Sequence, residues 1–246
     1  MKSDGKGVIK MNDQEVLDLI KRRKSARSTI DSNRPVEPEV LNKMLEAATW
    51  APTAHNMQNF KIIAIDNKTI LTQLGELKSH IKPEFISENY RNVSFSEEEL
   101  KQKKTGILPI GTLEWYTEEA REGRLNLPPA QLGKMISDVP VLLLVLYDPN
   151  RRAPASEGDF LGVMSLGFMI ENMWLMATAL GLGLHIVSPL ADEPVSSEIK
   201  KILDIPENLK ITLGCRLGYL KTEETHQPRI RRNIEDFVSY NKYGDL

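Results

Sequence analysis

A basic run near the N-terminus has the residue types and the spacing of an anion site. Arg23 and Arg27 stand four positions apart with Ser25 between them, just after a segment of helical periodicity. Arginine binds phosphate through bidentate, charge-assisted hydrogen bonds, which a serine hydroxyl or a backbone amide can complete. The alternative is a solvated helix end, where cations suit the negative pole of the helix dipole. Spacing alone leaves both interpretations open.

Two further polar clusters lie far from this run in the sequence. In the segment 51–58, the amides of Asn56 and Gln58 stand two positions apart, and such a pair can satisfy the donor and acceptor edges of a heteroaromatic ring such as a flavin pyrimidine. The alternative here is a capped turn. The second cluster is a basic stretch near the C-terminus that contains Arg229 and Arg231. The alternative interpretation of this stretch is a solvated basic tail.

Several other kinds of chemistry lack their usual motifs. The sequence contains no Gly-x-Ser-x-Gly elbow, no His-Glu-x-x-His and no phosphate-binding Walker loop, and its glycine-rich pieces lie inside or after an expected helix, which argues against a dinucleotide-binding domain. The four histidines show no metal-ligand spacing, so we expect no metal. The single cysteine, Cys215, excludes an intrachain disulfide and indicates a core residue in a reducing compartment. No signal peptide is visible near the N-terminus, and we expect a cytoplasmic protein.

Composition and periodicity indicate one soluble domain of class α+β. The chain has 246 residues and a formal net charge of −2, which argues against a dedicated nucleic-acid or membrane-surface protein. Apolar spacing predicts helices at 12–24, from 38 to before 52, after Asn67, within 159–184 and at 194–203, and strands at 60–66, 139–147, 184–190 and 211–219. The long segment 159–184 is expected to be a buried core helix, because Glu171 and Asn172 at its midpoint are costly in a membrane. A loosely patterned segment, 80–134, is a candidate insertion or lid, and a tail runs from about 220 to 246.

The motifs occur together in a characteristic order. Arg-x-Ser-x-Arg follows the first helix, Ala-Pro-Thr and Asn-x-Gln precede the first strand, and the sequence then continues with Gly181-Leu182-Gly183, Leu217-Gly218-Tyr219 and Arg231 followed by Ile234-Glu235. This order and spacing resemble the FMN-dependent nitroreductase family of flavoproteins. The resemblance covers about 13–64 and 139–238 and leaves the segment 80–134 unmatched.

The resemblance implies a three-layer α-β-α sandwich with a mixed central sheet and an FMN in each of two interface pockets of a homodimer. The phosphate would be held by Arg23, Ser25 and Arg27 with Arg231 and Arg229, and Lys24 would lie along the flavin. The partner subunit would contribute Pro52, Thr53, Ala54, Asn56 and Gln58. Ile186, Val187, Ser188, Pro189 and Leu190 would lie against the isoalloxazine near N5, and the tail would embrace the neighbouring subunit.

The implied activity is an FMN-dependent oxidoreductase in which NAD(P)H delivers hydride to flavin N5 and a nitroaromatic or quinone acceptor then removes it by ping-pong kinetics. The flavin carries the chemistry, so no side chain is expected to be an indispensable acid or base. Asn59-Phe60 departs from the family's Pro-Trp after Asn-x-Gln, and the segment 80–134 lacks the Glu, Tyr and Lys spacing of the iodotyrosine deiodinase branch. That dehalogenating branch, a flavin-fragmenting branch and a storage protein that binds FMN without turnover remain alternatives. A nucleic-acid-binding patch at 21–27 is the weakest of these alternatives, since few aromatic residues lie nearby.

Overall fold

The computed structural model describes residues 12–27, 30–108, 117–155, 157–221 and 229–244. The chain divides into two compact units, each of which is described by itself. Unit 1 comprises the ranges 1–79 and 131–224, and unit 2 comprises 80–130 and 225–246. The segment expected to be an insertion therefore shares a unit with most of the C-terminal tail. The expectation of a single domain over the whole chain stays a prediction.

Unit 1 is built on a four-stranded sheet. Its strands are β1 (Phe60–Ile65), β4 (Val141–Tyr147), β6 (Lys210–Tyr219) and β5 (Leu182–Val187), in that spatial order. The three ladders between them are antiparallel. The expected mixture of strand directions is confined to one parallel bridge, in which Ser25 pairs with Leu184 at the edge of β5. Every residue of β4 is buried, as expected for a strand covered on both faces.

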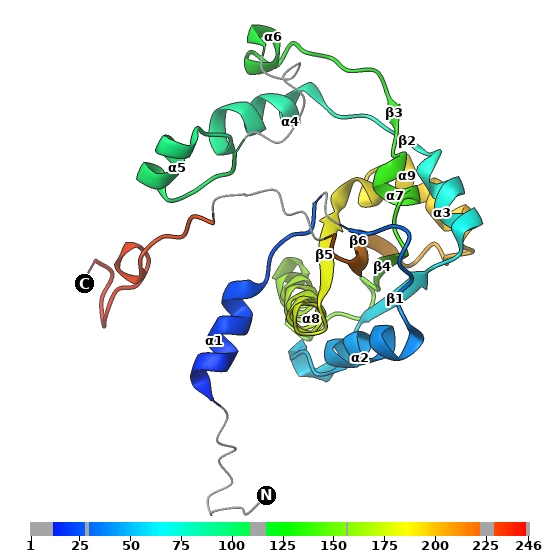
Figure 1. The fold of residues 1–246 in the computed structure, drawn as a ribbon, viewed down its shortest axis with the longest axis horizontal. Coiled ribbons are helices and arrows are strands. Elements are labelled where there is room, and N and C mark those ends of the chain that lie inside the picture. Colours follow the sequence, from blue (N-terminus) through cyan, green and yellow to red (C-terminus); the bar gives the residue numbers. More distant parts are fainter. Residues whose placement is uncertain (1–11, 28–29, 109–116, 156, 222–228, 245–246) are drawn as a thin grey trace, which may run out of the picture. The chain divides into compact units, whose positions relative to one another are not determined.

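Helices cover both faces of this sheet, which gives the predicted three layers (Figure 1). One apolar core lies between the sheet and the helices α2 (Pro38–Thr49) and α8 (Phe160–Ala179), and it includes Leu143 and Val145 of β4. The other includes Leu142 and Leu144 and lies against α3 (Lys68–Gly75), α7 (Lys134–Ser137) and α9 (Val195–Ile202). The two cores draw on alternate residues of β4 because successive side chains of a strand point to opposite faces.

Local signals set several helix boundaries where the sequence predicts them. The side chain of Asn12 accepts a hydrogen bond from the backbone N–H of Gln14 at the start of α1 (Asp13–Arg22). Asn67 caps α3 in the same way, accepting from the amides of Thr69 and Ile70. Pro38 occupies the first turn of α2, where its missing N–H has no helical partner to lose.

The strand expected at 184–190 is partly wrong. The strand β5 begins two residues earlier, at Leu182, and ends at Val187. Residues Ser188–Ala191 instead form the 3₁₀ turn η5. Proline at 189 has a fixed φ and no N–H to donate to a ladder, which favours the end of the strand here. The segment predicted to face a flavin is consequently a turn at the end of an edge strand.

The helix α8 is the expected core helix, and it is buried on the face that meets the sheet. Met169, Met173 and Ala177 are fully buried, whereas Phe160 is 66% exposed, Val163 59% and Phe168 41%. The helical segment Glu157–Ala179 is long and apolar enough to cross a membrane by length and composition, a test that core helices of soluble proteins also pass. The exposed apolar face of α8 also includes Leu161 and Met164. These residues form a continuous apolar patch, whereas the surface of a monomer normally carries apolar side chains that are scattered singly.

Unit 2 contains short helices and most of the tail. The helices α4 (Pro83–Glu88), α5 (Glu97–Lys103) and α6 (Glu118–Arg121) accompany a π-helical turn, η2 (Asn89–Val93), and a 3₁₀ turn, η6 (Ile234–Asp236). Ser96 and Glu99 form a capping box on α5. Lys104 Nζ lies 3.2 Å from Asp236 Oδ2, so the insertion and the tail are joined by an ion pair. The strands β2 (Lys78–Ser79) and β3 (Ala130–Gln131) pair where the chain leaves and rejoins unit 1.

Candidate functional site

The basic run 23–27, which we call the basic segment, lies along the edge of the central sheet. Arg23 is the C-cap of α1, with φ of −55° and ψ of 128°, so the helix ends there and the chain becomes extended. Ser25 forms the parallel bridge to Leu184, and the Ala26 amide donates to the Leu184 carbonyl at 3.1 Å. A Cβ on Gly183 would stand 2.6 Å from the Ala26 Cβ, so glycine in β5 is required for this close approach.

The first residues of the basic segment contact the long helix α8. The guanidinium of Arg23 lies 4.8 Å from the ring centroid of Trp174, and its Nε is 3.6 Å from Glu171 Oε1. The indole N–H of Trp174 donates to the Lys24 carbonyl at 3.0 Å. These contacts fix the backbone at Lys24 and place the Arg23 side chain against the helix.

The end of the basic segment lies beside two other basic side chains. Arg216 Nη1 donates to the Arg27 carbonyl at 2.8 Å, and Arg216 pairs with His185 in the register of β5 and β6. Burial first, and then the positive charges of Arg216 and Arg27, lower the pKa of His185 to about 4. Burial also lowers the pKa of Arg216, against the opposing effect of Asp138. A positive potential that disfavours further protonation favours an anion.

This arrangement fits the phosphate of FMN. Within the described residues, His185 Nδ1 and Arg216 Nε are buried and have no hydrogen-bond partner. Buried polar atoms are normally satisfied, and Arg216 Nε can only donate, so its position in a positively charged region indicates that a further acceptor belongs there. Arg23, Ser25 and Arg27, as the sequence predicts, would hold such an anion at the sheet edge, with Lys24 between them.

The segment 51–58 forms a compact turn between α2 and β1. Thr53 Oγ1 accepts from the Gln58 amide at 3.2 Å, and the Gln58 side chain donates to Asn56 Oδ1 at 2.9 Å. His55, Asn56 and Gln58 have positive φ values of 51°, 52° and 42°. The Ala54 amide donates to Ser165 of α8 at 3.3 Å, and Pro52 is exposed. The NH₂ group of Asn56 and the side-chain carbonyl of Gln58 take no part in this hydrogen bond, so the pair offers both donors and an acceptor to a ring.

The segment 186–190 combines exposed and buried side chains. Ser188 is exposed, and Ile186 and Pro189 are partly buried. Val187 and Leu190 are 2% and 0% exposed in the core beneath α9. A Cβ on Gly214 would lie 2.3 Å from Leu190 Cδ1, so Leu190 packs directly on β6. If this segment contacts a flavin as predicted, Val187 and Leu190 contribute backbone rather than side chain.

The remaining predicted residues, Arg229 and Arg231, belong to unit 2. Both are exposed, and Arg231 Nη1 donates to the Ile230 carbonyl at 2.7 Å. Unit 1 therefore places the basic segment beside Leu184 of β5, two residues before the segment 186–190, while the contributions of that segment and of the two tail arginines stay predictions.

Sequence reasoning missed Arg216 and Trp174 as parts of this site. Arg216 stands among alternating apolar residues of β6, and a charged residue inside an interior strand was a usable signal. Trp174 carried no signal, because it is one of many apolar residues in α8. Asn59, where the sequence departs from the family pattern, is 5% exposed and donates to the Arg151 carbonyl at 3.0 Å, which gives it a structural contact.

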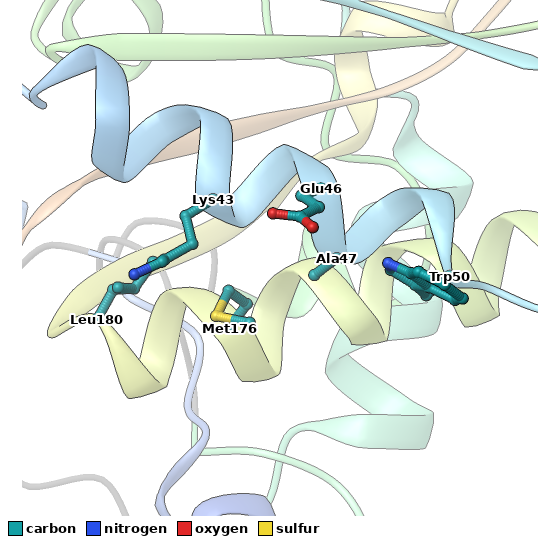
Figure 2. Close-up of a pocket in the computed structure, with 6 residues that line it drawn as sticks. All are labelled: Lys43, Glu46, Ala47, Trp50, Met176 and Leu180. Atoms are coloured by element: carbon teal, nitrogen blue, oxygen red, sulfur yellow. The ribbon is translucent and has the colours of Figure 1, made fainter.

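A surface groove of about 480 Å³ lies elsewhere on unit 1, between α2 and α8. Figure 2 shows Lys43, Glu46, Ala47 and Trp50 from the side of α2 and Met176 and Leu180 from α8. None of these six lining residues is a predicted cofactor ligand. Among the residues that the structure describes, no group of three or more His, Cys, Asp or Glu side chains could hold a metal ion.

Comparisons with known proteins identify the family of this chain. The model of the nitroreductase family matches residues 20–219. An NADPH-dependent oxidoreductase of Staphylococcus haemolyticus is 24% identical over 229 residues, which cover 93% of this chain and 74% of the relative. A nitroreductase with bound FMN from Bacteroides fragilis matches with a TM-score of 0.56 at 22% identity, over 90% of this chain and 96% of that one. The NADPH:FMN oxidoreductase of Vibrio harveyi, solved with NAD⁺, matches with a TM-score of 0.57 at 17% identity, over 94% of this chain and 78% of that one. With its family match over most of the length, this chain belongs to the nitroreductase family.

Proposed function

We propose that this protein is an FMN-dependent NAD(P)H oxidoreductase that reduces nitroaromatic or quinone acceptors. The observation that carries the proposal is the basic segment, which lies beside β5, where Arg27 and Arg216 concentrate positive charge next to a neutral His185. That charge suits the phosphate of FMN. Membership of the nitroreductase family and the names of the relatives, which include FMN-bound and NADPH-dependent enzymes, support the same assignment.

In this proposal the chain binds and orients the cofactor. Arg23, Ser25 and Arg27 hold the phosphate, together with Arg229 and Arg231 of the tail, and Lys24 lies along the ring. The turn η5 and the end of β5 place backbone and the Ser188 side chain beside the flavin. When bound, FMN supplies hydride transfer through N5, from NAD(P)H to the acceptor, in a ping-pong sequence. The segment 80–134, the candidate insertion or lid of the sequence, would select the acceptor.

A second copy of the chain completes the site in this proposal. The exposed apolar face of α8, with Phe160, Val163 and Phe168, needs cover that the described part of this chain does not supply. Val16, Leu17 and Ile20 of α1 are also exposed. A homodimer that buries α8 would bring the segment 52–58 of one copy, with Asn56 and Gln58, to the flavin of the other. The lone Cys215 is buried, and burial raises its pKa to about 12, which fits an inert thiol. A cytoplasmic location, as expected from the sequence, is part of the proposal.

The test begins with the purified full chain. A yellow protein with flavin absorption bands, dimeric by light scattering, is the expected result. Anaerobic stopped-flow mixing with NADPH or NADH should then bleach the flavin band, and a nitroaromatic or quinone should restore it. A colourless monomer that does not take up added FMN would refute the proposal. Bound flavin that stays oxidised for minutes with both nucleotides would favour a storage protein instead.

A further inference from the structure

The backbone of the basic segment is attached to the core of unit 1 at three points. Trp174 of α8 donates to the Lys24 carbonyl at 3.0 Å, and the Ala26 amide donates to the Leu184 carbonyl of β5 at 3.1 Å. Arg216 of β6 donates to the Arg27 carbonyl at 2.8 Å. Two of these three attachments are made by side chains, Trp174 and Arg216, that neither the sequence motifs nor the expected flavin contacts include.

The position of Arg216 is costly for a charged residue. The strand β6 lies between β4 and β5, and Arg216 is partly buried within it. On the same face of β6, Leu190 packs against the glycine at 214 and Pro140 against the glycine at 218, on either side of Arg216. Removing charge from water costs free energy unless hydrogen bonds compensate. The carbonyl of Arg27 is the acceptor that the structure gives it.

The position of Trp174 is equally specific. Its side chain is 8% exposed in the core between α8 and the sheet, yet its indole N–H reaches a backbone carbonyl in another element. Its ring also supports the guanidinium of Arg23 at 4.8 Å. A buried indole normally finds such a partner, and here the partner is the middle of the proposed phosphate site.

From these contacts we infer that Arg216 and Trp174 are positioning residues for the phosphate-binding segment: they hold the backbone on either side of Ser25 so that Arg23 and Arg27 face one anion. The inference rests on the proposed function. A site held in its bound geometry by its surroundings loses less conformational entropy on binding. Neither residue needs to touch the phosphate to have this effect.

The inference predicts that substitutions of Arg216 and Trp174 weaken the binding of the FMN phosphate and leave the binding of the flavin ring unchanged. Riboflavin shares the ring of FMN and lacks the phosphate, so the ratio of the two dissociation constants isolates the phosphate contribution. In Arg216→Met, which keeps the apolar stem and removes the donor and the charge, we expect FMN binding by the apoprotein to weaken about tenfold or more. Riboflavin binding should stay within about twofold. Trp174→Phe, which keeps a ring and removes the N–H, should lower the same ratio by about threefold to tenfold.

The matched control is Arg22→Met. Arg22 is exposed at the last turn of α1, one residue before the basic segment, and this variant removes the same charge without touching the Arg27 carbonyl. Its FMN-to-riboflavin ratio should equal that of the wild type. Equal weakening of FMN and riboflavin in both Arg216→Met and Trp174→Phe, or no weakening in either, would overturn the inference, because a general loss of structure affects both ligands.

Hydrogen exchange of the apoprotein separates this inference from the proposed function. The amides of Ala26 and Arg27 donate to Leu184 and Ser25, so exchange reports how firmly the segment is held. Faster exchange at these amides in Arg216→Met and Trp174→Phe, with unchanged protection in β4, is the expected result. Unchanged exchange in both variants overturns the inference. A wild type that binds neither FMN nor riboflavin overturns the proposed function, and the exchange result still decides the positioning roles.

Discussion

The two segments proposed to bind the flavin are held in different ways. The basic segment is fixed by distant residues, since its carbonyls at Lys24 and Arg27 accept from Trp174 and Arg216. The segment 52–58 is fixed mainly by its own side chains, through the bonds of Gln58 to Thr53 and Asn56. The first is therefore sensitive to the packing of the core, whereas the second behaves as a local turn with one attachment, from Ala54 to Ser165.

This difference follows from the two parts of FMN that the segments would bind, the phosphate and the edge of the ring. A phosphate needs several donors converging on one point, and only a rigid core can fix their directions. A ring edge needs one donor and one acceptor in one plane, which two neighbouring amides provide. The comparison predicts that substitutions near the basic segment act on FMN and spare riboflavin, whereas substitutions in the segment 52–58 act on both.

The largest expected effect comes from Arg27→Ala. Loss of a charge-assisted hydrogen bond to phosphate costs about 1.5 to 3 kcal/mol, so FMN binding should weaken roughly tenfold to a hundredfold. Fluorescence titration of the apoprotein with FMN and with riboflavin measures this, and riboflavin should be little affected. Arg22→Ala is the control for loss of a nearby charge. Unchanged FMN affinity in Arg27→Ala would remove Arg27 from the phosphate site.

Overpacking at β5 should act through the core on the same segment. In Gly183→Ala the new Cβ would stand 2.4 Å from Leu220 Cδ2 and 2.6 Å from the Ala26 Cβ. We expect the free energy of unfolding in urea to fall by about 1 to 3 kcal/mol. Adding Ala26→Gly removes one of the two clashes, and the double variant should recover part of the loss. No loss in Gly183→Ala would show that the basic segment is loosely packed on the sheet.

A smaller effect is expected in the local turn. Gln58→Met preserves side-chain length and removes the side-chain carbonyl and NH₂ groups, and the positive φ at this position is equally unfavourable for either residue. One neutral hydrogen bond is worth about 0.5 to 1.5 kcal/mol, so FMN and riboflavin should both bind about twofold to tenfold more weakly. A loss confined to FMN would contradict the assignment of this turn to the ring. Lys61→Met, at an exposed position of β1, serves as the control.

The smallest effect is the pH dependence of stability at His185. The pKa of this residue is about 4 in the folded chain against an ordinary 6.5, because of burial and then of Arg216 and Arg27. As the pH falls from 6.5 towards 4, the unfolded chain binds a proton that the folded chain does not, so stability decreases. Partial exposure reduces the effect, and we expect about 1 kcal/mol between pH 7 and pH 5.

Urea unfolding of the apoprotein at pH 7 and pH 5 measures this term. His185→Gln should remove the His185 share of the pH dependence, while His55→Gln, at an exposed position, should leave it unchanged. An identical pH dependence in wild type and His185→Gln would show that the positive potential beside Arg27 is weaker than the structure indicates.

Much of the fold was predictable because local patterns and global packing agree. Asn67 capped α3, Pro38 began α2, and the continuous apolar run at 141–147 became the strand buried on both faces. An error came where a pattern has two solutions. The run 184–190 is mostly apolar, with His185 and Ser188 as exceptions, and the turn at Ser188–Ala191 ends the strand within it. The largely apolar α8 is the core helix that the sequence predicts, and, as a single helix packed on a sheet, it buries the face that meets the sheet.

By itself, the sequence determined which residues carry charge, amides and caps, and therefore the family and the segments proposed to meet the flavin. The tertiary structure decided how those segments are held. Arg216 lies 189 positions from Arg27 in the chain, and Trp174 lies 150 positions from Lys24. Contacts over such separations are set by strand pairing and helix packing, which local spacing does not encode. The directions of the phosphate-binding side chains are consequently a property of the folded core.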